Sequence, residues 1–449
     1  MDETSIALKS TLTSYMAEVA AQAPTLGASN ILLRFGALSA GWDMLERYKL
    51  DTFAKQIDGP ISTTVLARDR LGRVISQGIN FGSQDYLSMT NHPGVKEAAR
   101  AAIAQYGVHS AGSPALMGNT NVSVELERRL SQWLGLSTCA LFPTGWGAGY
   151  GAIRALIRPT DHVVVDQLAH ACLWDGARAA SSHIHTFPHL SVRGLERCLK
   201  RIRAQDQGNG ILVVTESLFS MDADTPDLAA HQALCHQYGA TLLVDMAHDL
   251  GCMGEQGLGA LAEQGMLGKV DVVMGSFSKT FAANGGFVAC NEPGFKLAIR
   301  FNCGPHTYTN AISPVQAAVV LKVLDIVGSS EGAERRARLL RNSTHLRERL
   351  LADGWKVLGR PSAVVPLVLG GIGRSRFLTR FMLEHGMVVN LIEHPAVSMN
   401  GSRLRLQVMA DHSIEQLDAF VETLRLCAPL ADAELAAINA ARSPSDALI

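Results

Sequence analysis

Short apolar runs alternate with longer amphipathic segments over residues 138–290 of the chain. Several of these runs are rich in β-branched residues and apolar throughout, as strands buried on both faces of a parallel sheet must be. The segments 195–204 and 228–238 between them repeat their apolar positions with the period of a helix. We therefore expect an α/β domain with a mostly parallel sheet and right-handed crossovers. Its seven strands are expected at 138–142, 162–166, 182–186, 211–215, 241–245, 271–276 and 286–290.

The pattern changes after Pro314. A long helical pattern at 315–327 continues past a Gly-Ser-Ser break into the charge-rich segment 331–351. Strand-like runs follow at 363–369, 388–391 and 403–408, with helical patterns at 374–385 and 413–427 and a frayed tail at 440–449. We expect three parts: an N-terminal helical and extended segment at 1–80 with a helical pattern at 44–53, a large α/β domain at 81–314, and a linking helix with a smaller α+β domain at 315–449.

Composition and charge exclude several classes of protein. With 47% hydrophobic and 18% charged residues among 449, the chain can bury a sizeable core and is not expected to be disordered. Lys and Arg total 40 against 41 Asp and Glu, so there is no basic field to hold nucleic acid. The apolar stretches are much shorter than the roughly 20 residues of a membrane-spanning helix. The acidic start lacks the layout of a signal peptide, which favours a cytoplasmic location.

The eight cysteines do not form a metal-binding pattern. They include no CxxC pair and no Cys/His cluster at ligand spacing. We expect free thiols in a reducing compartment and no metal ion.

Two residues at predicted strand ends carry the clearest chemistry. Asp245 ends one apolar strand, and Lys279 follows the end of the next one among small hydroxyl residues. Open α/β sheets bind their ligands at the carboxyl ends of the strands. A lysine can form a Schiff base with the aldehyde of pyridoxal 5'-phosphate, and a carboxylate can hold the proton on the ring nitrogen. Either residue alone would be an ordinary turn carboxylate or surface lysine, but the combination predicts a site for this cofactor.

Further segments could complete that site. The glycine-rich turn from Gly145 to Gly149 lies between a strand and a helix, so backbone N–H groups there could bind a phosphate, together with the hydroxyls of Ser276 and Ser278. A histidine just beyond a strand end, His170, could stack on the pyridine ring. Ser220 and His248 could approach the ring oxygen. Taken singly, each of these is more often a plain turn residue or a core histidine.

In this order, these residues resemble the α-oxoamine synthases, pyridoxal-phosphate enzymes of fold type I that include serine palmitoyltransferase and 8-amino-7-oxononanoate synthase. The resemblance spans about residues 78–427 and rests on 80–87, 111–113, 118, 126–127, 145, 170, 216–222, 245–248, 279 and 403–406. Within the family, the sequence at 113–116, 144–146 and 169–178 is most similar to that of the enzymes that make α-hydroxyketone quorum-sensing autoinducers. The chain departs from the common pattern at Pro114, Ser123, Gly149 and Met246.

The resemblance implies roles for individual residues. Lys279 would hold the cofactor and move the Cα proton, while Asp245 would pair with the ring nitrogen. The remaining roles are His170 stacking on the ring, His248 and Ser220 at the ring oxygen, Gly145, Trp146 and Ser276 at the phosphate, and Arg403 at the amino-acid carboxylate. Arg405 lies two positions further on, on the same side of the strand, and is the alternative to Arg403. The family also implies a homodimer with the active site at the subunit interface, where 306–314 of one chain approaches the phosphate of the other.

The reaction implied is a decarboxylating Claisen-type condensation. A small amino acid and an acyl-CoA thioester would give an α-aminoketone, with release of CoA and CO2. The apolar pair Leu116–Met117 favours a medium or long acyl chain. An aminotransferase and a β-hydroxy amino acid aldolase need the same Asp245 and Lys279, so both remain alternatives. A non-catalytic scaffold subunit is disfavoured because Lys279 is present.

Overall fold

The computed structural model describes residues 32, 42, 45–46 and 49–440. The helix predicted at 44–53 lies partly outside these residues, although Leu45 and Glu46 are helical. The tail predicted at 440–449 also lies outside them, apart from residue 440 at the end of the last helix. No helix in the described part of the chain combines the length and the apolar composition needed to cross a membrane.

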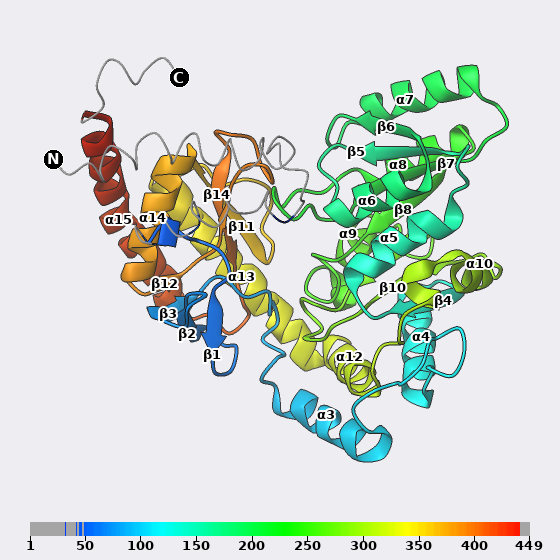
Figure 1. The fold of residues 1–449 in the computed structure, drawn as a ribbon, viewed down its shortest axis with the longest axis horizontal. Coiled ribbons are helices and arrows are strands. Elements are labelled where there is room, and N and C mark those ends of the chain that lie inside the picture. The colour runs from blue at the N-terminus through cyan, green and yellow to red at the C-terminus, as the bar shows by residue number, and fades with distance from the viewer. Residues whose placement is uncertain (1–31, 33–41, 43–44, 47–48, 441–449) are drawn as a thin grey trace.

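A seven-stranded sheet forms the centre of the larger half of the molecule (Figure 1). Its strand order is β4-β10-β9-β8-β7-β5-β6, and only β10 runs antiparallel to its neighbours. This confirms the predicted sheet. The strands are β4 (Thr138–Phe142), β5 (His162–Asp166), β6 (His183–Phe187), β7 (Ile211–Glu216), β8 (Thr241–Asp245), β9 (Val272–Ser276) and β10 (Gly286–Cys290).

Helices cover both faces of this sheet, which is why its central strands can be apolar throughout. Every residue of β5, β7 and β10 is buried. The covering helices are α4 (Asn121–Leu134), α5 (Gly145–Leu156), α6 (Ala171–Ala180), α7 (Val192–Gln205), α8 (Leu228–Gln237), η2 (Glu255–Gly257), α9 (Gly259–Glu263), α10 (Phe295–Asn302) and α11 (Gly304–Thr307). α12 (Pro314–Val327) packs on α4 and on α3 (Pro93–Tyr106) and leads out of this half.

The other half is reached through α13 (Ser330–Ala352), which crosses the molecule (Figure 1). It contains a three-stranded antiparallel sheet of β11 (Val364–Gly370), β14 (Ser402–Gln407) and β13 (Leu391–Ile392). α14 (Ile372–Glu384) and α15 (Ile414–Ala440) pack on each other beside it. α15 extends beyond the helix predicted at 413–427, because it continues through Pro429.

A second sheet in this half joins segments that are far apart in the sequence. β1 (Gln56–Asp58), β2 (Thr64–Arg68) and β3 (Val74–Asn80) form an antiparallel meander, and β12 (Met387–Val388) pairs in parallel with β3. The single strand predicted at 388–391 is therefore wrong. The chain turns between β12 and β13 at Asn390, whose side chain donates a hydrogen bond to the carbonyl of Gly82 (2.8 Å), so the two short strands enter different sheets.

Candidate active site

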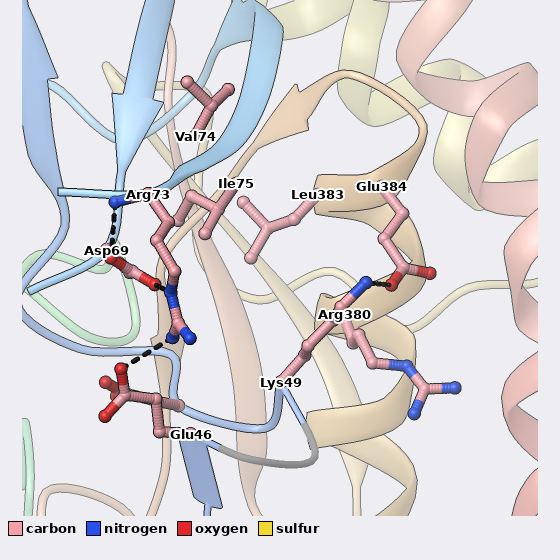
Figure 2. Close-up of a pocket in the computed structure, with 10 residues that line it drawn as sticks. Glu46, Lys49, Asp69, Arg73, Val74, Ile75, Arg380, Leu383 and Glu384 are labelled. Carbon is pink, nitrogen blue, oxygen red and sulfur yellow. Dashed lines mark hydrogen bonds and ion pairs between the residues drawn. The ribbon is translucent and has the colours of Figure 1, made fainter. Parts of the chain in front are cut away.

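Two cavities differ sharply in chemistry. One, of ≈ 460 Å³, lies between the β2–β3 hairpin and α14 (Figure 2). Its charged side chains pair with one another: Arg73 with Asp69 and Glu46, both at 2.6 Å, and Lys49 with Glu384 at 3.3 Å. The pair of Lys49 with Glu384 joins the N-terminal region to α14, whereas both pairs of Arg73 lie within the N-terminal region.

The second cavity, of ≈ 270 Å³, lies at the carboxyl ends of the parallel strands. It brings together most of the residues predicted for the cofactor. Its lining residues are Thr144, Gly145, Trp146, His170, Cys172, Glu216, Asp245, Ala247, His248, Met274, Ser276, Ser278, Lys279, Asn284 and Gly285. Because strand ends deliver these side chains, their positions follow from the sheet itself.

Asp245 and Lys279 face this cavity from the ends of neighbouring strands. Asp245 is 4% exposed, and one of its carboxylate oxygens accepts the N–H of Ala247 at 2.8 Å. Lys279 Nζ has no hydrogen bond or ion pair with any described residue. Burial lowers the pKa of Lys279, an effect that Asp245 partly offsets, and burial raises the pKa of Asp245 while Lys279 lowers it. A lysine of lowered pKa is more readily the neutral amine that condenses with an aldehyde.

Glu216 was not predicted as a site residue. It is the register partner of Asp245 on the adjacent parallel strand and is 2% exposed. Its Oε1 is buried without a hydrogen-bond partner. Burial, and then the charge of Asp245, raise the pKa of Glu216 well above its usual range. The available signal was its position at the end of an apolar strand, the same position that identified Asp245.

The N-terminus of α5 forms the opposite end of the cavity. Gly145 starts the helix so close to β9 that an added Cβ would lie 2.3 Å from the Oγ of Ser276. The hydroxyls of Ser276 and Ser278 are 2.8 Å apart beside it. Trp146, 47% exposed, stacks on Tyr150 with ring centroids 5.0 Å apart. A helix N-terminus with two hydroxyls next to it is a suitable site for a phosphate group.

His170 caps the start of α6 and its orientation is fixed by that role. Its Nδ1 accepts the backbone N–H of Cys172 at 3.2 Å and lies 3.0 Å from the thiol sulfur of the same residue. Burial lowers the pKa of His170. Nδ1 therefore acts as an acceptor and the ring proton resides on Nε2.

His248 lies in the cavity with its ring held by Tyr86, whose hydroxyl is 2.9 Å from Nδ1. Burial raises the pKa of Tyr86 and lowers that of His248 well below its usual range. Both groups are therefore neutral, and one hydrogen bond joins the phenol to the imidazole. Ser220, predicted beside His248, is buried in the loop after β7 but is not among the residues that line this cavity.

The two arginines of β14 differ in their partners. Arg403 forms an ion pair with Asp222 and donates to the carbonyls of Met221 and Gly401, each at 3.0 Å. Arg405 has a buried Nε without a partner, and among the described residues its Nη1 donates only to the sulfur of Met221 at 4.0 Å. Its charge lowers the pKa values of Lys279, His170 and His248, whereas that of Arg403 does not contribute to them. Arg405 does not line the cavity but acts on it through its charge, whereas Arg403 is engaged by Asp222.

The donor set fits pyridoxal 5'-phosphate. A lysine without a partner, a buried carboxylate, a capping histidine and a helix N-terminus surround one cavity. They match the aldehyde, the ring nitrogen, the ring face and the phosphate of the cofactor in turn. Together with the doubly covered, mostly parallel sheet, they define a transferase of the fold-type-I pyridoxal-phosphate class.

Comparison with known proteins gives the family. The model of the aminotransferase class I and II family matches residues 76–424. Serine palmitoyltransferase of Sphingobacterium spiritivorum is 33% identical over 344 residues, which cover 77% of this chain and 85% of the relative. 8-Amino-7-oxononanoate synthase of Geobacter sulfurreducens is 32% identical over 367 residues, which cover 81% of this chain and 93% of the relative. The structure of Sphingomonas wittichii serine palmitoyltransferase superimposes with a TM-score of 0.83 at 29% identity, covering 90% of this chain and 100% of that one.

The chain belongs to the aminotransferase class I and II family and, within it, to the α-oxoamine synthases, which are pyridoxal-phosphate-dependent acyltransferases. The resemblance to the α-oxoamine synthases noted in the sequence is confirmed.

Proposed function

We propose that this enzyme condenses a small amino acid with an acyl-CoA and releases CoA and CO2 to give an α-aminoketone. The observation that carries the proposal is the placement of Lys279 and Asp245 on one cavity, in a chain similar to enzymes named serine palmitoyltransferase and 8-amino-7-oxononanoate synthase. The sequence similarity to the autoinducer-making enzymes and the apolar pair Leu116–Met117 support a medium or long acyl chain.

The residues of the cavity divide the work between them. Pyridoxal 5'-phosphate, when bound, supplies an electron-withdrawing ring that acidifies the Cα–H bond of the amino acid. Lys279 would hold the cofactor through its Nζ and would take the Cα proton at the same atom. Asp245 stabilises a proton on the ring nitrogen. His170 would lie against the ring. His248, kept neutral by burial, would donate its Nε2–H to the ring oxygen in the tautomer whose Nδ1 accepts from Tyr86.

The phosphate is held by the start of α5. We assign it to the N–H groups of Gly145 and Trp146 and to the hydroxyls of Ser276 and Ser278. Ser220, expected at the ring oxygen, is buried outside the cavity lining, so we assign it no direct contact with the cofactor.

We assign the amino-acid carboxylate to Arg405 in preference to Arg403. Arg405 retains a buried N–H without a partner and acts electrostatically on Lys279. The guanidinium of Arg403 is already bound by Asp222. A guanidinium that is not already paired with a carboxylate can bind the substrate carboxylate through two hydrogen bonds and so orient the Cα–H bond for cleavage.

We further propose a homodimer. The loop around Gly112 is bonded to the segment after α11, through Ser113 Oγ to the Thr307 carbonyl (2.6 Å) and Ala311 N–H to the Gly112 carbonyl (2.9 Å). Large apolar side chains are exposed on these segments and on neighbouring α10: Leu116 80%, Met117 88%, Phe301 74% and Tyr308 88%. Apolar surface of this kind marks a protein interface, and the partner is a second copy of this chain.

Thiol release tests the reaction. The purified enzyme, loaded with cofactor, is assayed across small amino acids and acyl-CoA chain lengths. We expect free CoA only when both substrates are present. The pair that reacts fastest identifies the product. If amino acids change the cofactor absorbance but no thioester releases thiol, the condensation is wrong, and transamination or aldol cleavage takes its place.

A further inference from the structure

A fully buried carboxyl group follows Asp245 in the turn after β8 and has no part in the function proposed above. Asp249 is 0% exposed. One of its oxygens, Oδ2, accepts the N–H of Ala260 at 2.8 Å, and the other, Oδ1, lies 2.7 Å from the Oγ of Ser217. The backbone approaches closely as well, since a Cβ at Gly259 would lie 2.4 Å from Oδ2. Asp249 is therefore held from two sides.

Ser217 connects this carboxyl to the end of β8. Its N–H donates to the carbonyl of Asp245 at 2.8 Å, and its Oγ lies 3.2 Å from the same carbonyl oxygen. A hydroxyl has one proton to donate, yet Ser217 Oγ faces two acceptors, Asp245 O and Asp249 Oδ1. Both contacts are hydrogen bonds at once only if the carboxyl of Asp249 carries a proton. The order of donation is then Asp249 to Ser217 to the Asp245 carbonyl.

We propose that Asp249, in its protonated form, is a positioning residue that acts through Ser217 to hold the end of β8 and, with it, the carboxylate of Asp245. The inference rests on the role proposed for Asp245 at the ring nitrogen. Loss of the Asp249 proton turns the hydroxyl of Ser217 toward Asp249, so the Asp245 carbonyl keeps only the N–H of Ser217.

The surroundings place this proton exchange near neutral pH. Burial raises the pKa of Asp249 to about 7, hydrogen bonds from Ala260 and Ser217 oppose the rise, and the charge of Glu263 on α9 adds to it. Glu263 is itself paired with Arg360 at 2.7 Å. The other titratable group against Asp249 is the thiol of Cys252, which stays neutral because burial raises its pKa. The hydrogen-bonded chain is therefore complete below about pH 7 and broken above it.

The test follows cofactor affinity with pH. The dissociation constant of pyridoxal 5'-phosphate is measured by absorbance titration in wild type, Asp249→Asn and Ser217→Ala. We expect the wild-type constant to rise about two- to tenfold through the titration, the factor that one hydrogen bond contributes. Asp249→Asn donates to Ser217 and accepts from Ala260 at every pH, so it should keep the low-pH value throughout. Ser217→Ala should show the high-pH value throughout.

A readout without cofactor separates this proposal from the role of Asp245. Infrared difference spectra of the cofactor-free protein should show the carbonyl band of a protonated carboxylic acid that titrates near pH 7 and is missing from Asp249→Asn. Glu263→Gln should lower its midpoint, because Glu263 raises the pKa of Asp249. Absence of this band, or a pH step in cofactor affinity that survives in Asp249→Asn, overturns the proposal. If Asp249→Asn does not fold, a step retained by Ser217→Ala overturns it. If Asp245→Asn leaves the cofactor spectrum unchanged, the role of Asp245 fails instead.

Discussion

Glu216 and Asp245 are register partners on adjacent parallel strands, so their side chains leave the sheet on the same face and line the same cavity. Two carboxyl groups placed in this way do not readily ionise together. Burial raises the pKa of both groups. Lys279 partly offsets this rise for Asp245, whereas the charge of Asp245 adds to the rise for Glu216. Of the two carboxyl groups, Glu216 is therefore the one that holds a proton more readily.

This difference predicts a pH dependence of stability. The folded-state pKa of Glu216 is raised, so its contribution is fully present below the unfolded-state pKa of about 4.3 and is lost as pH rises through the folded-state value. Glu216→Gln mimics the neutral acid. It should therefore reduce the fall in the free energy of unfolding with pH by up to about 1.4 kcal/mol per pH unit. Chemical denaturation of the cofactor-free protein at several pH values measures it. The exposed Glu97→Gln serves as control and should leave the pH slope unchanged.

Replacing Lys279 should separate cofactor binding from cofactor attachment. Lys279→Ala leaves the phosphate site at the start of α5 intact but has no amine to bond the aldehyde or take the Cα proton. We expect loss of the absorbance band of the covalently attached cofactor, and thiol release reduced by about 10² to 10⁴, the range for a general base. Lys269→Ala, at an exposed lysine, is the control. Full turnover by Lys279→Ala would refute the catalytic assignment.

The two arginines of β14 should give opposite phenotypes. Arg405→Ala is expected to weaken amino-acid binding by about 1.5–3 kcal/mol, the contribution of a hydrogen bond to a charged group. The dissociation constant would rise about 10- to 150-fold in a titration of the cofactor absorbance. Arg403→Ala breaks the ion pair with Asp222, so it should lower the melting temperature and leave that constant unchanged. The reverse pattern would return the carboxylate site to Arg403.

The close approach of α5 to β9 predicts a steric effect on the cofactor. In Gly145→Ala the new Cβ would lie 2.3 Å from the Oγ of Ser276, so the helix start or the serine must shift. Overpacking costs about 1–3 kcal/mol, which corresponds to a five- to 150-fold weaker binding of pyridoxal 5'-phosphate. Gly304→Ala, at the start of α11, is the matched control because nothing lies within 4 Å of its added Cβ. Equal affinity in both variants would show that Gly145 does not shape the phosphate site.

The exposed apolar segments predict a dimer that charge can disrupt. Met117→Glu and Tyr308→Glu place a carboxylate on side chains that are each 88% exposed in the single chain. We expect light scattering to give the mass of a dimer for wild type and of a monomer for both variants. Leu71→Glu, exposed on the β2–β3 hairpin, should remain dimeric. A monomeric wild type would contradict the proposed interface.

The fold could be predicted from the sequence where burial determines which residue types a segment contains. Strands such as β5 and β7 are covered on both faces, so they are apolar along their whole length and stand out in the sequence. The run at 388–391 shows the converse. Four residues carry no sign of a turn between two sheets, and the contact of Asn390 with Gly82 that makes the turn joins segments remote in sequence.

Within the site, the sequence identifies residues whose role follows from residue type and from a position at a strand end. It does not identify residues whose role depends on which side chain lies next to them in the folded protein. Asp245 and Lys279 are identified by position and type. Glu216 becomes distinctive only through the register that places it beside Asp245. Alternation puts Arg403 and Arg405 on one face of a strand, so what separates them is the loop carboxylate of Asp222, which binds only Arg403.

The parallel pairing of β3 with β12 also has a consequence for biosynthesis. The ribosome releases the β1–β3 meander about 300 residues before β12, a delay on the order of half a minute at common rates of translation. During that time the outer edge of β3 has its N–H and C=O groups unpaired in the nascent chain. The C-terminal half therefore completes its folding only after synthesis reaches its last fifth, and a chain stalled in the large domain exposes a strand edge open to aggregation.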